Sequence, residues 1–258
     1  MADFNFPEVT LLVTHYNRSK SLERLLQAFR DLDCAFGDVV VSDDCSHPVH
    51  LQALETLQEN FSIRLVHASL NKGLGNNINK GQDAVRTPYT LYVQEDFVPT
   101  AEFLPAFRHS LHMLRTDPEV DIMRFYAYYA YPYLKPASHG FSHMLYRPWF
   151  MHTSKIYQYS DHPHLRRSTF LQKFGRYTEG IKSDRTEYRM CISFIRNKGK
   201  AMFYDAFDTL FLQENSEQEP STVQRSKWRQ SDNLVIAIVR TVYRQLKYNY
   251  DLHLRPKL

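Results

Sequence analysis

An acidic segment follows the apolar run 91–93 and consists of Gln94, Glu95 and Asp96. Alternation of side chains along a strand would put Gln94 and Asp96 on one face and Glu95 on the other. Carboxylate oxygen is the ligand that hard cations such as Mg²⁺ and Mn²⁺ prefer, so Asp96 is a candidate metal ligand. The alternative is an acidic strand end that holds no metal.

Glycines at the start of a predicted helix indicate phosphate binding. Gly73 and Gly75 lie where the predicted helix 74–85 begins. Glycine lets a backbone approach a ligand closely, and the free N–H groups and dipole of a helix N-terminus favour phosphate. Lys72 could neutralise a diphosphate directly. A glycine-rich loop alone is an unspecific signal.

Two residues at the end of the first predicted strand, Thr14 and Tyr16, could meet a nucleobase. A loop in this place can offer backbone groups and an aromatic ring, and a base binds by stacking and by hydrogen bonds to its edge. The alternative is an ordinary strand-to-helix turn with Asn17 or Ser19 as the N-cap. Asp44, which ends the second predicted strand, could likewise do no more than close an Asx turn.

A carboxylate on the inner face of a predicted helix is a candidate general base. Helical spacing over residues 184–198 places Glu187 on the same face as Met190, Cys191 and Phe194. A carboxylate among apolar side chains requires a reason, and proton transfer would be one. The alternative is a capping box, because Asp184 precedes Glu187 by three residues.

The elements that would position these residues alternate between strand and helix in the first part of the chain. We predict strands at 9–13, 38–42, 63–67 and 89–93, and helices at 21–29, 50–59 and 74–85. This order is typical of βαβ units and a mostly parallel sheet. The candidate residues lie just after the carboxyl ends of the strands, where open α/β sheets bind ligands.

The second half is less regular. Residues 125–159 are rich in Tyr, His and Pro; alternation at 126–128 suggests a strand, and we interpret the whole stretch as sheet edge with a loop-rich region that could receive a ligand. A helix at 184–198, a strand at 200–204 and a loop at 213–226 follow. His162 and His164 flank Pro163, a pattern more typical of a loop than of a metal site.

The last predicted helix, at 231–247, is basic and amphipathic. One side carries Leu234, Ile238 and Val242, and another side carries three cations, Arg240, Arg244 and Lys247. Such a helix could bring the protein to anionic lipid as a peripheral membrane contact. We expect instead that its apolar side packs on the domain.

Four segments together resemble the inverting glycosyltransferases of family 2. They are Thr14-His15-Tyr16-Asn17, Asp43-Asp44-Cys45-Ser46, the two Asn-x-Gly motifs that end at Gly73 and Gly81, and Gln94-Glu95-Asp96 with two apolar residues and Pro99 behind it. The resemblance covers residues 9–99 well and 170–204 loosely. It implies a GT-A fold, an α/β Rossmann-like three-layer α/β/α sandwich with a mostly parallel central sheet.

The resemblance also implies one domain over residues 1–258. Residues 1–105 would be the nucleotide-sugar-binding half and 106–225 the acceptor and catalytic half. Residues 226–258 would be the C-terminal basic amphipathic helix and tail.

Each candidate residue takes a role from the resemblance. Donor binding would fall to Thr14, Tyr16, Asp44, Lys72, Gly73 and Glu95, with Asp44 accepting a hydrogen bond from the imide of uracil or thymine. Asp96 would hold Mn²⁺ or Mg²⁺ on the donor diphosphate. Glu187 would deprotonate the acceptor hydroxyl, with Asp184 and Glu179 as substitutes.

Three positions depart from the family pattern. Cys45 replaces a glycine, Gln94 replaces the first acid of the metal motif, and Tyr188 stands where a second acid is usual. A neutral amide is a weaker ligand than a carboxylate, so metal affinity is reduced unless Glu95 swings in to help.

The implied activity is transfer of a sugar from a nucleoside-diphosphate sugar, linked to UDP or dTDP, to a hydroxyl of a saccharide or lipid-linked acceptor in surface polysaccharide synthesis. A nucleotidyltransferase is a rival interpretation, although no Gly- and Arg-rich loop follows the first strand. A non-catalytic nucleotide-sugar-binding module is another, motivated by Gln94 and Tyr188. The absence of GxGxxG after the first strand disfavours a dehydrogenase.

Composition narrows the class further. A formal net charge of +4 over 258 residues is too small by itself to argue for nucleic acid. Three cysteines without a CxxC spacing favour a reducing compartment. No secretory signal or apolar stretch of about 20 residues is visible, so we expect a cytoplasmic protein that is soluble or peripheral at the inner face of the membrane.

Overall fold

Four parallel strands form the N-terminal part of the computed structural model, which describes residues 4–215 and 234–254. Strands β1 (Phe4–His15), β2 (Cys34–Asp43), β3 (Arg64–His67) and β4 (Tyr89–Gln94) lie in the order β3-β2-β1-β4. Helices α1 (Ser19–Asp31), α2 (Pro48–Phe61) and α3 (Leu74–Ala84) connect them. The predicted alternation of strand and helix is confirmed.

Five more strands extend this sheet beyond β4. They follow in the order β9 (His164–Arg167), β6 (Ile122–Arg124), β10 (Ala201–Tyr204), β8 (Phe141–Met144) and β7 (Leu134–Pro136). Strand β9 is antiparallel to both of its neighbours, β4 and β6, whereas β10 is parallel to β6. A separate pair, β5 (Phe97–Pro99) and β11 (Phe211–Gln213), is antiparallel. Five further helical segments complete the described chain: α4 (Phe103–Thr116), η1 (Thr153–Ile156), α5 (Phe170–Phe174), α6 (Ser183–Arg196) and α7 (Leu234–His253).

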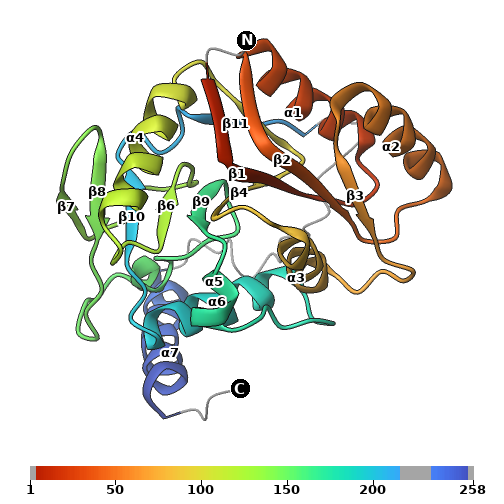
Figure 1. Cartoon of the computed structure of the whole chain (residues 1–258). Helices are drawn as coiled ribbons and strands as arrows, with labels where there is room; N and C mark the ends of the chain where they lie inside the picture. The colour runs from red at the N-terminus through yellow and green to blue at the C-terminus, as the bar shows by residue number, and fades with distance from the viewer. Residues whose placement is uncertain (1–3, 216–233, 255–258) are drawn as a thin grey trace.

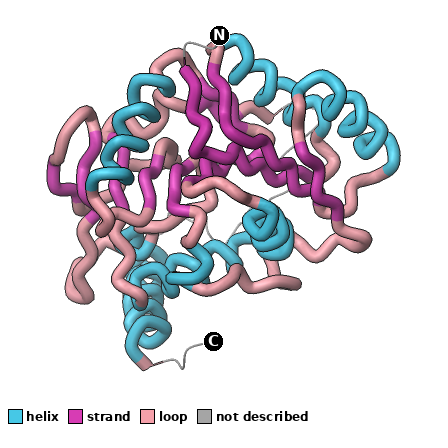
Figure 2. The backbone as a smooth tube through the Cα atoms, in the orientation of Figure 1, coloured by secondary structure: helices cyan, strands magenta, loops and turns pink. Residues whose placement is uncertain are grey.

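Helices cover both faces of the sheet (Figure 1). Alternate residues of β1 enter different cores: Leu11 packs with α1, α2 and α4 on one face, and Leu12 packs with α3, α5 and α6 on the other. Figure 2 shows the strands as a layer between these helices. The three-layer α/β/α sandwich with a mostly parallel sheet is therefore confirmed.

The predicted strand at 126–128 is wrong. Strand β6 ends at Arg124, and the chain then leaves the sheet. The N–H of Phe125 donates to the carbonyl of Pro163, and the N–H of Ala127 donates to the carbonyl of Phe207. Because these acceptors lie on two different loops, no ladder can form. The interpretation of 125–159 as sheet edge holds for β7, which is the last strand of the sheet.

Helix α7 lies differently from our expectation. It continues to His253, and Val242, which we expected to pack on the domain, is 54% exposed. The buried face is formed instead by Tyr248, Asp251 and Leu252. The side chains of Leu234 and Ile238 and most of the predicted loop 213–226 lie outside the described residues. None of the described helices has the length and apolar content needed to span a bilayer.

Candidate active site

The carboxyl ends of β1, β2 and β4 open into a cleft of about 880 Å³. This is the edge at which open α/β sheets bind ligands. Eight predicted site residues line the cleft: Thr14, Tyr16, Asp44, Gly73, Glu95, Asp96, Asp184 and Glu187. The other two, Lys72 and Glu179, are not among the lining residues.

Asp44 clamps the loop that precedes α3. One carboxylate oxygen accepts the N–H of Lys72 at 3.0 Å and the other accepts the N–H of Gly73 at 2.8 Å. Gly73 has a φ angle of +81°, a backbone conformation that residues with a side chain rarely adopt. This conformation explains why a glycine stands at position 73. A carboxylate oxygen can accept more than one hydrogen bond, so Asp44 can still receive a donor from a ligand.

Position 75 requires a glycine for a different reason from the one we predicted. A Cβ at this position would stand 2.3 Å from the carbonyl oxygen of Thr178. The residue is therefore needed for the close packing of α3 against the segment 176–180, and not for approach to a ligand.

Asp43, which precedes the clamp, joins the first two strand ends. It accepts hydrogen bonds from Nδ1 of His15 at 2.8 Å and from the N–H of Ser46 at 3.0 Å, and a third from the Ser46 hydroxyl. Burial acts to raise the pKa of Asp43, but these hydrogen bonds outweigh it and hold the pKa below its usual range. The strand ends are thus tied together around a buried charge.

The end of β4 does not follow the predicted alternation. The strand ends at Gln94, and Glu95 and Asp96 lie in a turn. Both carboxylates therefore face the same cation, Arg18, whose Nη1 lies 3.7 Å from Oε1 of Glu95 and 3.3 Å from Oδ2 of Asp96. Nη2 of Arg18 donates to Oδ1 of Asn215 at 2.8 Å. We did not predict Arg18, because no spacing rule relates it to a turn so distant in sequence.

The two oxygens of Asp96 have different surroundings. Oδ2 accepts a hydrogen bond from Nε2 of Gln213 at 2.8 Å. Oδ1 is buried and has no hydrogen-bond partner among the described residues. A buried, unpartnered carboxylate oxygen fits a divalent cation, which proteins often hold through one or two carboxylates together with substrate phosphates. The described residues contain no cluster of three or more His, Cys, Asp or Glu side chains that would hold a metal without substrate.

Glu187 lies in the cleft near the start of α6. Its Oε1 accepts the hydroxyl of Ser160 at 2.7 Å and the N–H of Asp161 at 3.2 Å. The helix begins at Ser183 with Lys182 as its N-cap, and no side chain caps it. Glu187 therefore lies more than one turn inside the helix, and the capping-box alternative is wrong.

The two substitutes for Glu187 are placed differently from each other. Glu179 accepts hydrogen bonds from Asn76 at 2.7 Å and Asn79 at 2.9 Å, and these bonds lower its pKa. It ties the segment 176–180 to α3 outside the cleft. Asp184 is exposed and lines the cleft. Of the two, only Asp184 is placed to meet an acceptor.

A second acid, Asp161, lines the cleft beside Glu187. Burial raises the pKa of Asp161 to about 8, and the charge of Glu187 adds to the rise. The hydroxyl of Tyr159 donates to its Oδ1 at 2.5 Å and shares a further hydrogen bond of 2.6 Å with the hydroxyl of Tyr177. Arg166 donates to Tyr177 at 2.6 Å. This buried network fixes the segment that holds Glu187.

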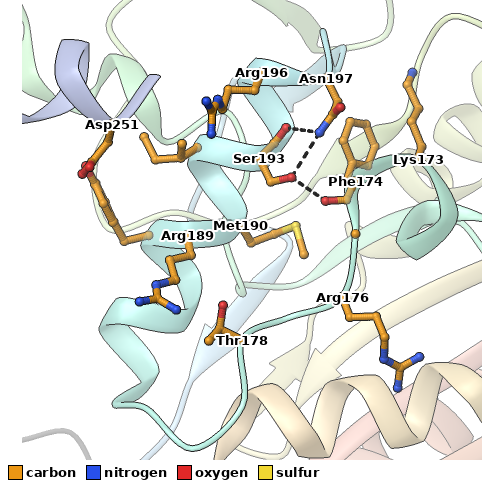
Figure 3. A pocket seen from close by; sticks show the side chains of 13 residues that line it. Lys173, Phe174, Arg176, Thr178, Arg189, Met190, Ser193, Arg196, Asn197 and Asp251 are labelled. Carbon is orange, nitrogen blue, oxygen red and sulfur yellow. Dashed lines mark hydrogen bonds between the residues drawn. The ribbon is translucent and has the colours of Figure 1, made fainter. Parts of the chain in front are cut away.

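A second cavity, of about 600 Å³, lies between α5, α6 and the chain that connects them (Figure 3). Arg176 and Arg189 lie on either side of Thr178 in this view. Arg176 forms two hydrogen bonds with Asp83, and Lys173 forms two with Asp121. Two of the lining cations therefore already have acidic partners, and none of the predicted site residues lines this cavity.

Comparisons with known proteins bear on the family and the fold. The model of the family described as "Glycosyl transferase family 2" matches residues 10–176. No curated protein matches the sequence. The solved structure of S. aureus TarS 1-349 in complex with UDP-GlcNAc is similar, with a TM-score of 0.62 and 14% identity over 96% of this chain and 76% of that chain. The mannosyltransferase PcManGT from Pyrobaculum calidifontis in complex with GDP-Man and Mn²⁺ is similar with a TM-score of 0.54 and 15% identity, over 98% of this chain and 73% of that chain. At these identities the likeness concerns the fold.

Proposed function

Since this chain belongs to glycosyltransferase family 2, we propose that it transfers a sugar, with inversion, from a UDP- or dTDP-linked donor to a hydroxyl of a saccharide or lipid-linked acceptor. The observation that carries the proposal is that one cleft brings together Asp44, Asp96 and Glu187. In this proposal Asp44 accepts a hydrogen bond from the nucleobase, Asp96 is a metal ligand, and Glu187 takes a proton from the acceptor hydroxyl. We assign the reaction to the cytoplasmic side of a cell that builds surface polysaccharide.

The donor half of the cleft is formed by residues 1–105. Tyr16 stacks on the base, and Asp44, held by the N–H groups of Lys72 and Gly73, accepts the imide N–H of uracil or thymine. The clamp supports this assignment because it fixes the carboxylate before a ligand arrives. Thr14, whose hydroxyl shares a hydrogen bond of 3.0 Å with Tyr92, lies beside the base. Lys72 does not line the cleft, and in this proposal its side chain reaches the diphosphate from the rim.

The diphosphate lies against the turn after β4. Asp96 offers its unpartnered Oδ1 to Mn²⁺ or Mg²⁺, and Glu95 is the second carboxylate at this turn. A cation held there would stabilise negative charge on the departing nucleoside diphosphate. Oδ2 of Asp96 already has Arg18 and Gln213 as partners.

We assign the acceptor to the second half of the same domain, which carries Glu187. Both hydrogen bonds that orient Glu187 go to Oε1. The carboxylate takes the proton of the acceptor hydroxyl while the hydroxyl oxygen bonds to the anomeric carbon. The bond from that carbon to the diphosphate oxygen breaks on the opposite side, which inverts the configuration.

Product analysis tests the proposal. The protein is incubated with UDP- and dTDP-sugars, Mn²⁺ and saccharide or lipid-linked acceptors, and the released nucleotide is identified. We expect nucleoside diphosphate, with inverted configuration in the product. Release of pyrophosphate in a parallel incubation with a nucleoside triphosphate and a sugar 1-phosphate would identify a nucleotidyltransferase, and donor binding without release of nucleoside diphosphate would identify a binding module. Either result would overturn the proposal.

A further inference from the structure

Helix α7 turns an apolar stripe toward solvent. Six side chains form this stripe, five in α7 and Leu254 directly after its end, each with more than half of its surface exposed: Val239, Val242, Tyr243, Leu246, Tyr250 and Leu254. Their spacing of three and four residues places them within an arc of about 120° on the helix. Exposed apolar surfaces that are contiguous mark interaction sites in proteins.

The opposite face of α7 is fastened to the domain. Asp251 accepts the hydroxyl of Tyr188 in α6 at 2.7 Å, and the rings of Tyr188 and Tyr248 are 5.8 Å apart. Leu252 is buried beside them. The helix therefore cannot rotate to bury the apolar stripe without breaking these contacts.

A neighbouring loop adds to the exposed apolar surface. In this Trp149 loop (145–152), Trp149 is 67% exposed and Met151 is 73% exposed. The side-chain amide of Gln245 in α7 donates to the carbonyl of Met151, which joins the loop to the helix. Arg147, also exposed, stacks over the ring of Trp149 with its guanidinium carbon 5.4 Å from the ring centroid.

The charge beside these apolar groups is positive. Arg240, Arg244 and Lys247 follow one edge of the apolar stripe, with Lys247 already paired to Asp251. A helix with aliphatic and aromatic residues on one face and cations at its edge is typical of helices that lie in a lipid interface. Tyrosine and tryptophan favour this interface, and anionic lipid attracts arginine.

We propose that the apolar stripe and the Trp149 loop dock on a membrane surface that contains anionic lipid. A second copy of the chain is the competing occupant. A two-fold contact through the apolar stripe with the helices antiparallel would bring the arginines of both copies together, which is unfavourable. The lipid surface instead complements both the apolar and the charged groups.

Docking would bring the membrane close to the acceptor end of the cleft. Tyr188, which fastens α7, is the residue after Glu187. On the proposed function, on which this step rests, an acceptor anchored in lipid then reaches Glu187 from the membrane side. The surface thus favours a lipid-linked acceptor over a free saccharide.

Vesicle flotation with the full chain tests the proposal. Phosphatidylcholine vesicles with and without phosphatidylglycerol are compared at low and high salt, for wild type and Leu246→Glu. Leu70→Glu is the matched control, because Leu70 is 63% exposed and Leu246 is 68% exposed, and Leu70 lies in the loop between β3 and α3, outside the apolar stripe and the Trp149 loop. Circular dichroism verifies that each variant is folded.

We expect binding to the anionic vesicles that salt weakens, and a loss of about tenfold or more in Leu246→Glu, since a leucine no longer enters the interface. Leu70→Glu should bind as wild type does. Absence of vesicle binding, or equal binding by Leu246→Glu, would overturn the proposal, as would a dimer in light scattering that Leu246→Glu dissociates. Affinity for UDP, measured in parallel, reports on the proposed function alone and should be equal in all three proteins.

Discussion

The guanidinium group of Arg18 lies 3.3 Å from Oδ2 of Asp96, so the proposed metal ligand already has a cation on one side. Glu95 lies 3.7 Å from the same group. One buried arginine therefore balances two carboxylates at the turn after β4. The arginine counters the repulsion between these carboxylates, while Oδ1 of Asp96 has no hydrogen-bond partner among the described residues.

Replacing Arg18 by methionine tests this balance. Without the arginine, two nearly buried carboxylates lose the cation that lies 3.3 Å from Asp96 and 3.7 Å from Glu95, so we expect a loss of about 3 kcal/mol in the free energy of unfolding. Mn²⁺ should restore part of the loss in the variant, measured as the melting temperature with and without the ion. Arg18→Lys, which retains a charge, should lose less. A methionine variant that is as stable as wild type without Mn²⁺ would contradict the balance.

Metal-dependent donor binding should depend on Asp96. Asp96→Asn removes the charged Oδ1, so we expect most of the Mn²⁺-dependent affinity for UDP to disappear in calorimetric titration. Gln94→Asp adds a carboxylate at the same strand end and should leave that affinity intact or increase it. If a chelator has no effect on UDP binding by wild type, the metal assignment fails.

Base preference should follow from Asp44. A carboxylate accepts the imide N–H of uracil or thymine, so UDP and dTDP should bind better than GDP and ADP. In Asp44→Asn only one side-chain oxygen remains to accept the N–H groups of Lys72 and Gly73. We therefore also expect the free energy of unfolding to fall by about 1–2 kcal/mol in this variant. Equal affinity of wild type for all four nucleotides would refute the assignment.

Glu187→Gln separates chemistry from folding. The amide oxygen can still accept from Ser160 and from the N–H of Asp161, so the melting temperature should change little. The amide cannot take a proton at neutral pH, so turnover at saturating donor should fall by about 10²–10⁴. Normal turnover in the variant would move the search for the base to Asp184.

The buried carboxyl of Asp161 should make stability depend on pH. Its pKa is raised to about 8 in the folded protein, from about 3.9 in an unfolded chain. Between these values the folded state binds more protons than the unfolded state, so stability falls as pH rises, by at most about 1.4 kcal/mol per unit. Asp161→Asn should remove this slope, and its stability relative to wild type should increase from pH 5 to pH 8 in denaturant titrations. A constant difference would show that Asp161 is ionised in the fold.

The sequence predicts the parts of the site that lie at strand ends. Thr14, Asp44 and Asp96 follow apolar runs that the sequence pattern identifies as strands, and parallel strands bring their carboxyl ends together. The contact between Arg18 and Asp96 was not predictable in this way, because a turn, not strand alternation, orients Asp96. We did not predict Asp161, because its raised pKa depends on burial by residues from several elements. No local sequence pattern indicates such burial.

The position of β9 has a consequence for synthesis of the chain. Strands β1 to β4 can pair as they leave the ribosome, but β4 then presents an open edge until residues 164–167 have emerged and filled it. The last part of the sheet, beyond β9, cannot be joined to the first part before that moment, because β9 bonds to both β4 and β6. During translation there is therefore an interval in which the first part of the sheet has formed and the edge of β4 is unpaired. In that interval the nascent chain is most exposed to aggregation and most in need of a chaperone.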